Sequence, residues 1–352
     1  MNITLINVLF PALIAFLIGV MITPIVTHFL YKYKVWKKQG GKVAMNGQVA
    51  SVFNELKGSE ETKTPRMGGI VIWMSIILTL GAAYLIANLF PDSPFGELDF
   101  ISRSQTLIPT MTLIAGALVG FLSDFYDITH EGKGMRLSLR LLIVTTLSGA
   151  LGWWFYEKLG ITGINIPFDG TLELGIFIIP FFIVLTICLY ASGVIDGIDG
   201  LSGGVFATIF GAYAGIALIQ SQFGIAAFCA TTVGAILAFL WFNVPPARYW
   251  MTETGTMSLT LALSTVVFMT DTLGDGYGIA LLPIVGLPLV VTVASNVIQI
   301  LYRKATGKKF FRIAPLHHHF EAIGWPSYKV TMRYWIISIV CACIGVIFAT
   351  IA

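Results

Sequence analysis

Charged side chains are scarce in this 352-residue sequence. Lysine, arginine, aspartate and glutamate make up only 11% of it, whereas 56% of the residues are hydrophobic and the mean hydropathy is +0.84. A soluble domain of ordinary composition has about 25% charged residues, so this balance excludes a chain that folds in water alone. The composition predicts an integral membrane protein, with the lipid bilayer as its surroundings.

Cysteines are also few, and they form no metal or redox motif. The four cysteines, Cys188, Cys229, Cys341 and Cys343, lie inside apolar runs, and none has the C-x-x-C spacing. We expect them to be small core or lipid-facing residues. The sequence also lacks a Pro- or Ser-rich linker and any repeat with a period of roughly 20 to 50 residues. Residues 1–352 are therefore predicted to form a single polytopic membrane domain.

What the sequence has in abundance is long apolar runs, enough for about ten membrane-spanning helices of roughly 20 residues each. The runs lie at residues 8–31, 68–90, 106–123, 139–157, 174–193, 201–220, 224–242, 256–271, 278–302 and 333–352. The first is too long for the apolar part of a signal peptide, so we expect it to remain as the first span. Pro283 and Pro288 predict a kink or break in the ninth. The predicted fold is all-α and integral to the membrane.

Lysine and arginine are distributed unevenly between the two sides of this map. All but two of the 21 basic residues, Arg103 and Lys158, lie in or beside the loops that follow odd-numbered spans. Basic residues near span ends are retained in the cytoplasm, which predicts that these loops are cytoplasmic and that both termini are outside. We interpret the basic residues as topology signals, so nucleic acid is not an expected partner. Acidic residues of the outward loops, such as Asp271, are expected to be solvated connectors.

Two pairs of aspartates lie at the predicted cytoplasmic ends of spans. Asp124 and Asp127 close the third span, and Asp196 and Asp199 follow the fifth in a glycine-rich run. Carboxylates at a membrane boundary are costly to desolvate unless a cation, a basic partner or water compensates them. With Lys133 nearby, they could bind Mg²⁺ and phosphate oxygens and stabilise a transferring phosphoryl group. For the glycine-rich run, an exposed turn is the alternative.

Two more loops on the same side carry polar clusters. The loop before the eighth span offers Asn243, Glu253 and two hydroxyls among aromatic residues, and the alternative there is an interfacial aromatic anchor with Glu253 solvated. The last loop contains three consecutive histidines, His317, His318 and His319. Neighbouring side chains diverge, which disfavours one shared zinc ion. We therefore favour hydrogen bonding of these histidines to phosphate or sugar.

Several of these runs give the chain a family resemblance. The most specific is FFRIAPLHHHFEAIGWPSYKVTMRYWIIS at 310–338, supported by the runs at 64–69, 196–201 and 239–243. Nearly end to end, the chain resembles the phospho-N-acetylmuramoyl-pentapeptide transferase family, within the wider polyprenyl-phosphate N-acetylhexosamine-1-phosphate transferases. The resemblance implies Mg²⁺-dependent transfer from UDP-N-acetylmuramoyl-pentapeptide to undecaprenyl phosphate, releasing UMP, at the cytoplasmic face of the bacterial inner membrane. It leaves a homodimer open.

The resemblance also implies roles for individual residues. The catalytic residues are expected to be Asp124, Asp196, Asp199, Glu253 and His319. The expected Mg²⁺ ligands are Asp196, Asp199 and Glu253. The expected substrate-binding residues are Lys63, Arg66, Lys133, Asn243, His317 and His318. All of them lie in or beside the loops that the basic residues place in the cytoplasm.

Four positions depart from the family pattern. Ser123 stands where the family has an aspartate, Gly193 where it has an asparagine, Arg66 where it has a threonine, and Glu253 for the aspartate of a Met-Gly-Asp-x-Gly run. These departures motivate a second hypothesis, a catalytically silent lipid- or nucleotide-binding relative. A transporter is the third, since membrane carboxylates and Pro-broken helices also mark ion pathways. The carboxylates lie at span ends rather than at the midplane, which favours an enzyme.

Overall fold

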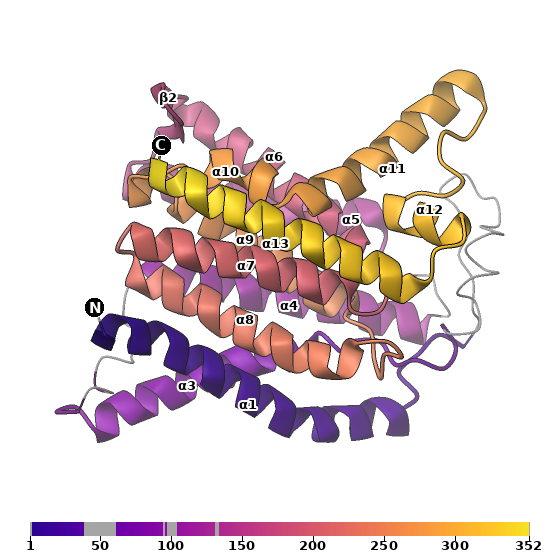
Figure 1. Ribbon diagram of the computed structural model, residues 1–352, viewed down its shortest axis with the longest axis horizontal. Coiled ribbons are helices and arrows are strands. Elements are labelled where there is room, and N and C mark those ends of the chain that lie inside the picture. The colour runs from indigo at the N-terminus through magenta and orange to yellow at the C-terminus, as the bar shows by residue number, and fades with distance from the viewer. Residues whose placement is uncertain (1, 39–60, 94–95, 97–103, 131–133, 352) are drawn as a thin grey trace.

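The computed structural model describes residues 2–38, 61–93, 96, 104–130 and 134–351. These form a bundle of long helices with one small hairpin (Figure 1). The helices are α1 (Asn2–Lys32), α3 (Ile70–Leu89), α4 (Ser104–Thr129), α5 (Leu137–Leu159), α6 (Ile178–Ser192), α7 (Leu201–Ile219), α8 (Phe223–Asn243), α9 (Thr252–Met269), α10 (Gly278–Val285), α11 (Leu287–Thr306), α12 (Leu316–Ala322) and α13 (Ser327–Ile351).

Eight helices in the described part of the chain are long and apolar enough to cross a membrane, namely α1, α3, α4, α5, α6, α7, α8 and α13. Helices α10 and α11 together form a ninth candidate span, bent by 72°. The break falls between Pro283 and Pro288, because a proline removes a helical hydrogen bond and crowds the preceding turn. The predictions of an all-α multi-span membrane protein and of a broken ninth span are confirmed.

Helix α9 occupies the centre of the bundle, although it is not among those eight. Every residue from Thr254 to Met269 is buried, and α4 packs along it while α3, α6, α7 and α10 also contact it. Its hydroxyls are tolerated inside because they bond their own helix, as Thr260 does to the carbonyl of Thr256 at 2.8 Å. Glycine allows the close approach of α4, since a Cβ on Gly120 would collide with the Glu253 carbonyl.

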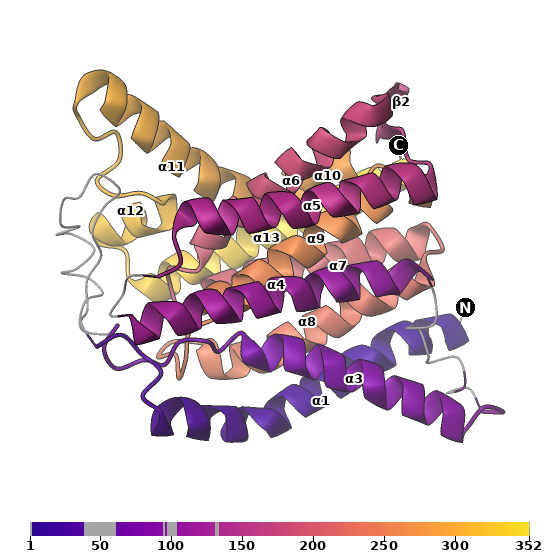
Figure 2. The ribbon, with the colours of Figure 1, turned by 180° about the vertical axis from the view of Figure 1, so that it is seen from behind.

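The two ends of the bundle differ in what they carry. Both termini and strand β2 lie at one end, whereas α12 lies at the opposite end (Figures 1 and 2). We call these the terminal end and the α12 end. Termini on one side require an even number of crossings, which the eight candidate spans, the bent pair and α9 together provide. Which end faces the cytoplasm stays a prediction from the basic residues.

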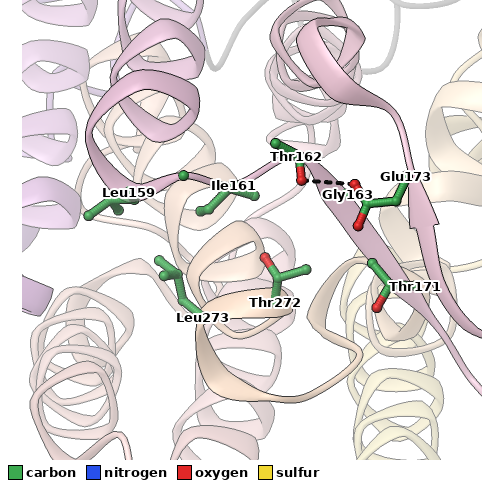
Figure 3. Close-up of a pocket in the computed structure, with 9 residues that line it drawn as sticks. Leu159, Ile161, Thr162, Gly163, Thr171, Glu173, Thr272 and Leu273 are labelled. Carbon is green, nitrogen blue, oxygen red and sulfur yellow. Dashed lines mark hydrogen bonds between the residues drawn. The ribbon is translucent and has the colours of Figure 1, made fainter.

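The terminal end carries a hairpin that the all-α prediction did not include. Strands β1 (Gly163–Ile166) and β2 (Gly170–Glu173) pair antiparallel, with Gly163 opposite Glu173. A hollow of about 240 Å³ lies between this hairpin and the turn after α9, and Thr162, Thr272 and Leu273 are among its lining residues (Figure 3). Within it, the Thr162 hydroxyl donates to Glu173 Oε2 at 2.8 Å.

Asp271 fastens this hairpin to the bundle. Its side chain is 1% exposed, and it accepts hydrogen bonds from the backbone N–H groups of Asn165 at 2.8 Å and Ile279 at 3.0 Å. The first N–H groups of a helix have no partner within it, so a free N–H donor in the first turn of α10 compensates for the burial of the Asp271 carboxylate. Burial raises the pKa of Asp271 to about 6, while the backbone hydrogen bonds act to lower it. The expectation that Asp271 is a solvated connector was wrong.

Candidate active site

Two of the predicted catalytic aspartates meet at the α12 end through a residue that was not predicted. The hydroxyl of Thr252, at the start of α9, donates to Asp124 Oδ2 at 2.6 Å. The backbone N–H of the same residue donates to Asp196 Oδ2 at 2.8 Å. Asp124 comes from the last turns of α4 and Asp196 from the turn before α7. Thr252 therefore joins three segments that are far apart in sequence.

Asp124 is buried among donors. Its side chain is 1% exposed, and Oδ2 also accepts hydrogen bonds from the backbone N–H of Thr254 at 2.8 Å and from its hydroxyl at 2.6 Å. Arg66 spans two carboxylates, with Nη2 at 3.4 Å from Asp124 Oδ1 and Nη1 at 3.2 Å from Asp127 Oδ2. These donors and the guanidinium compensate the burial of Asp124.

The position of Arg66 follows from backbone pairing of its loop with the segment before α9. The N–H of Trp250 donates to the Pro65 carbonyl at 2.8 Å, and the N–H of Gly68 donates to the Trp250 carbonyl at 2.7 Å. Glycine is required next to this contact, because a Cβ on Gly69 would collide with the backbone of Gly255. The predicted substrate-binding residue Arg66 is thus brought to the carboxylates, where it pairs with acidic side chains.

Asp196 is held by one hydroxyl and one amide. The hydroxyl of Ser202 donates to Oδ1 at 2.6 Å, while Oδ2 receives the Thr252 N–H. Burial raises the pKa of Asp196 above its usual value, the two hydrogen bonds act against this, and the nearby charge of Asp124 raises it further. Two carboxylates that lie in each other's field in this way attract a cation.

Asp199 is turned away from this pair. Its Oδ2 accepts the backbone N–H of Ala247 at 3.0 Å, and its Oδ1 accepts the indole N–H of Trp250 at 3.1 Å. Both carboxylate oxygens therefore hold the loop between α8 and α9 against the turn before α7. Asp199 therefore stabilises the conformation of that loop. Its carboxylate does not lie with those of Asp124 and Asp196, where a metal ion would be bound.

The side-chain amide of Asn243, like the carboxylate of Asp199, holds backbone groups of neighbouring segments. Its Oδ1 accepts the backbone N–H of Gly200 at 2.9 Å, and its Nδ2 donates to the Tyr249 carbonyl at 2.7 Å. The side chain is buried at 2% exposure. The predicted substrate contact is therefore engaged inside the protein, where Asn243 links the end of α8 to the same turn that Asp199 holds.

Glu253 forms an ion pair with Arg140 at the start of α5. The two side chains are 28% and 21% exposed, so water reaches both. Within the part of the chain that the structure describes, no three acidic, histidine or cysteine side chains are grouped to hold a metal ion. The predicted ligand set of Asp196, Asp199 and Glu253 is therefore not assembled, because Asp199 faces its loop and Glu253 faces Arg140.

Two of the three consecutive histidines lie over the acidic turn. A Cβ placed on Gly197 would lie 2.5 Å from His317 Nε2 and 2.6 Å from His318 Nε2, so both rings pack against this glycine. Both histidines are buried. His318 Nδ1 lies 2.7 Å from Glu321 Oε2, one turn along α12. This contact orients His318 with its other ring nitrogen toward the turn that contains Asp196.

His319 has a different environment. Its Nδ1 accepts the backbone N–H of Arg312 at 3.2 Å, and its ring packs edge-on against Phe311. Successive residues of a helix point about 100° apart, so His319, two residues after His317, points to nearly the opposite side of α12 from His317. The predicted catalytic residue thus braces the loop before α12, and the structure does not bring it to the acidic pair.

Two of the predicted substrate-binding residues, Lys63 and Lys133, are not placed at the site by the structure. Lys63 is exposed at the surface, and Lys133 lies outside the described residues. The sequence reasoning missed Thr252, Arg140 and Glu321. Thr252 could have been suspected because it stands at the glycine of the Met-Gly-Asp-x-Gly run, but nothing in the sequence pairs Arg140 with Glu253, which lies 113 positions away.

Comparisons with known proteins identify the family of this chain. The model of the family described as Glycosyl transferase family 4 matches residues 106–271, which include Asp124, Asp196 and Thr252. A protein of Geobacillus sp. (strain WCH70) named phospho-N-acetylmuramoyl-pentapeptide-transferase is 33% identical over 338 residues, 95% of each chain. A protein of the same name from Bacillus subtilis (strain 168) is 32% identical over 345 residues, 96% of this chain and 97% of the relative. The chain belongs to the phospho-N-acetylmuramoyl-pentapeptide-transferase family.

Proposed function

We propose that this protein transfers phospho-N-acetylmuramoyl-pentapeptide from UDP-N-acetylmuramoyl-pentapeptide to undecaprenyl phosphate, releasing UMP, at the cytoplasmic face of the bacterial inner membrane. The observation that carries the proposal is the convergence of Asp124 and Asp196 on Thr252, beside His317 and His318, where the membrane helices end. A lipid-linked phosphate and a water-soluble nucleotide can meet only at such a boundary. Membership of the family supports this choice of donor and acceptor.

The transfer makes a phosphoanhydride bond to the acceptor phosphate and breaks the one to UMP, so charge must be balanced on phosphoryl oxygens. Arg66 is a fixed positive charge beside Asp124 and Asp127. His318, oriented by Glu321, points its other ring nitrogen toward the turn of Gly197 and, when the ring carries both protons, donates a hydrogen bond to a phosphate oxygen there. These side chains bind and orient the diphosphate in the proposed site.

Mg²⁺ fits the two converging carboxylates, although not the three ligands expected from the sequence. Each oxygen of Asp196 accepts one hydrogen bond and so keeps a lone pair, and burial raises the pKa of this group. Mg²⁺ is commonly held by one or two carboxylates together with substrate phosphates. Asp196 and Oδ1 of Asp124 would hold the ion, because Asp124 Oδ2 already accepts three hydrogen bonds. The ion would neutralise charge on the phosphoryl oxygens.

The direct test is release of UMP by purified protein given Mg²⁺, polyprenyl phosphate and UDP-N-acetylmuramoyl-pentapeptide. We expect turnover that requires all three and that UDP-N-acetylglucosamine does not sustain as donor. A control without lipid separates transfer from hydrolysis of the nucleotide sugar. Turnover that persists with excess chelator would contradict the role of Mg²⁺ while leaving the transfer intact.

A catalytically silent nucleotide-binding relative is the second candidate. The observation that favours it is the presence of two guanidinium groups on the carboxylates, Arg66 on Asp124 and Asp127 and Arg140 on Glu253. Such pairs neutralise acidic side chains without a metal. Protein that binds the donor but releases no UMP under any metal or lipid condition would establish this candidate in place of the transferase.

The proposal also requires the α12 end to face the cytoplasm. In a cysteine-free background, Lys308→Cys lies in the exposed loop before α12, and Asp92→Cys lies in an exposed turn at the terminal end. An impermeant thiol reagent added to intact cells should label the Asp92 variant and leave the Lys308 variant unlabelled until the membrane is opened. The reverse pattern would place the candidate site on the wrong side for a cytoplasmic nucleotide.

A further inference from the structure

Thr252 adopts a backbone conformation that its residue type disfavours. Its φ is +54°, in the left-handed region that a β-branched residue rarely enters because Cβ approaches the backbone. Glycine, which has no Cβ, enters that region without this steric penalty. A threonine held here needs interactions that glycine cannot make.

The hydroxyl of Thr252 makes two such interactions, one as a donor and one as an acceptor. The Thr252 hydroxyl donates to Asp124 Oδ2 at 2.6 Å and accepts the backbone N–H of Met67 at 3.1 Å. Its own backbone N–H donates to Asp196 Oδ2 at 2.8 Å. One residue thus contacts both carboxylates and ties them to the loop that carries Arg66.

We propose that Thr252 is the positioning residue for the acidic pair, and that its hydroxyl and N–H together fix the separation of Asp124 and Asp196. The two carboxylates then meet a shared ligand, a divalent cation with the diphosphate of a nucleotide, as a preorganised pair. This inference rests on the proposed function for the identity of the ligand. Thr252 acts through the aspartates and does not itself touch the substrate.

The consequence of losing the hydroxyl is specific. Asp124 Oδ2 would keep both donors of Thr254 and would stay compensated in its buried position. What disappears is the contact between Asp124 and the residue that holds Asp196, together with the contact to Met67. Each aspartate keeps its other hydrogen bonds, but the distance between the two carboxylates is held less tightly. Cation binding therefore weakens although the fold survives.

Three variants of Thr252 distinguish the effect of losing its hydroxyl from the effect of relieving its backbone strain. Thr252→Ser keeps the hydroxyl, Thr252→Ala removes it and keeps the strain, and Thr252→Gly removes both. The matched control is Thr260→Ala, whose buried hydroxyl donates only to the carbonyl of Thr256 within α9. Mn²⁺ serves as the probe cation, because electron paramagnetic resonance of the free ion gives its binding constant without any turnover, and thermal unfolding in detergent reports the fold.

We expect Thr252→Ala and Thr252→Gly to weaken Mn²⁺ binding by roughly tenfold, the effect of one lost hydrogen bond to a charged group. Thr252→Ser and Thr260→Ala should stay within about twofold of the parent protein. Unfolding of Thr252→Gly at the parent temperature would exclude a folding defect. Weak binding by Thr252→Ser would assign the effect to the threonine methyl group and overturn the proposal.

Two further outcomes distinguish this inference from the proposed function. If the parent protein binds no Mn²⁺, or if Thr252→Ala binds it as tightly as the parent does, Thr252 does not position a cation-binding pair. If the order of Mn²⁺ affinities is as expected but the parent protein releases no UMP, the positioning role stands and the transferase assignment fails. If Thr252→Ser releases UMP as the parent does and Thr252→Gly does not, both the positioning role and the transferase assignment are supported.

Discussion

Each end of the bundle buries aspartate, and the partners of those aspartates differ. At the terminal end, Asp271 accepts backbone N–H groups from Asn165 and Ile279, and its charge meets no second buried carboxylate among its hydrogen-bond partners. At the α12 end, Asp124 and Asp196 share Thr252 as donor, and the charge of one raises the pKa of the other. Burial of an acid alone therefore does not indicate a functional site, whereas convergence of several charges does.

Both ends join residues that are far apart in sequence, but they differ in how many segments meet there. Asp271 accepts the N–H of Ile279, eight positions later in the first turn of α10, and the N–H of Asn165 in strand β1, 106 positions away. Asp124 and Thr252 are separated by 128 positions, and Asp196 and Thr252 by 56. The acidic pair exists only when α4, the turn before α7 and α9 are assembled, whereas the Asp271 cap depends on the local course of the chain together with one strand.

The largest expected difference between the ends is in activity. Asp196→Asn removes a charge beside the proposed Mg²⁺ and should lower the rate of UMP release by about 10²–10³, the usual cost of one lost transition-state contact. Asp271→Asn lies at the other end and should leave the rate unchanged. Equal losses of rate in the two variants, measured on folded protein, would remove the functional distinction between the ends.

Asp199 tests the same distinction inside the α12 end. Because its oxygens hold Ala247 and Trp250, Asp199→Asn should lower the unfolding temperature through one lost acceptor and alter Mn²⁺ affinity less than Asp196→Asn does. A larger effect of Asp199→Asn on Mn²⁺ affinity would restore Asp199 as a metal ligand, as expected from the sequence.

The next largest effect should divide the histidines. His318 faces the acidic turn and His319 faces Arg312, so His318→Ala should lower UMP release by about 10² if it hydrogen-bonds the phosphoryl group. His319→Ala should cost less than tenfold and should act mainly on stability. Glu321→Gln, which alters the partner of His318 Nδ1 and also the acceptor of the Ser327 hydroxyl, should reproduce part of the His318 effect and change its pH profile. Equal rates for His318→Ala and His319→Ala would contradict this division.

The sequence predicted the features that depend on local pattern. Apolar runs located the spans, and Pro283 and Pro288 located the break between α10 and α11. The expected divergence of neighbouring histidines holds for His319 but not for His317 and His318, whose ring centres lie 4.4 Å apart. It did not predict that α9 begins at Thr252, because the polar first turn resembles a loop until the surrounding helices bury it.

Partnerships between distant segments could not be read from one sequence. Glu253 and Arg140 lie 113 positions apart. In the sequence, Arg140 cannot be distinguished from the other basic residues that mark the cytoplasmic ends of spans. Asp271 was expected to be solvated because the pattern around it is polar, and its burial follows from the hairpin, which packs Asn165 against it.

A smaller effect is expected from the titration of Asp271. Its folded-state pKa is about 6, against 3.8 for the ordinary group, so the folded protein retains a proton that the unfolded chain has already lost. This contribution to stability is fully present below about pH 4 and is lost as the pH rises through 6, with a total on the order of 3 kcal/mol. Thermal unfolding of the parent protein and of Asp271→Asn between pH 4 and 7 should show a steeper fall for the parent. Parallel curves would mean that Asp271 is not the titrating group.

The smallest effect concerns the ion pair between Glu253 and Arg140. Because both side chains are more than one-fifth exposed, the coupling between them should contribute only about 0.5–1 kcal/mol to stability, which a double-mutant cycle of Glu253→Gln and Arg140→Ala measures.

The same cycle tests whether Glu253 has a role in catalysis beyond this pair. If Glu253 acts only by holding Arg140, the two single variants and the double variant should lose the same rate of UMP release. If Glu253 instead approaches the proposed cation during turnover, Glu253→Gln should lose more than Arg140→Ala. Glu253→Asp, whose carboxylate is shorter by roughly 1.5 Å, should then lose activity as well, although it restores the aspartate of the family. A fully active Glu253→Gln variant would leave this pair as a surface contact, and the acidic chemistry of the α12 end would rest on Asp124 and Asp196.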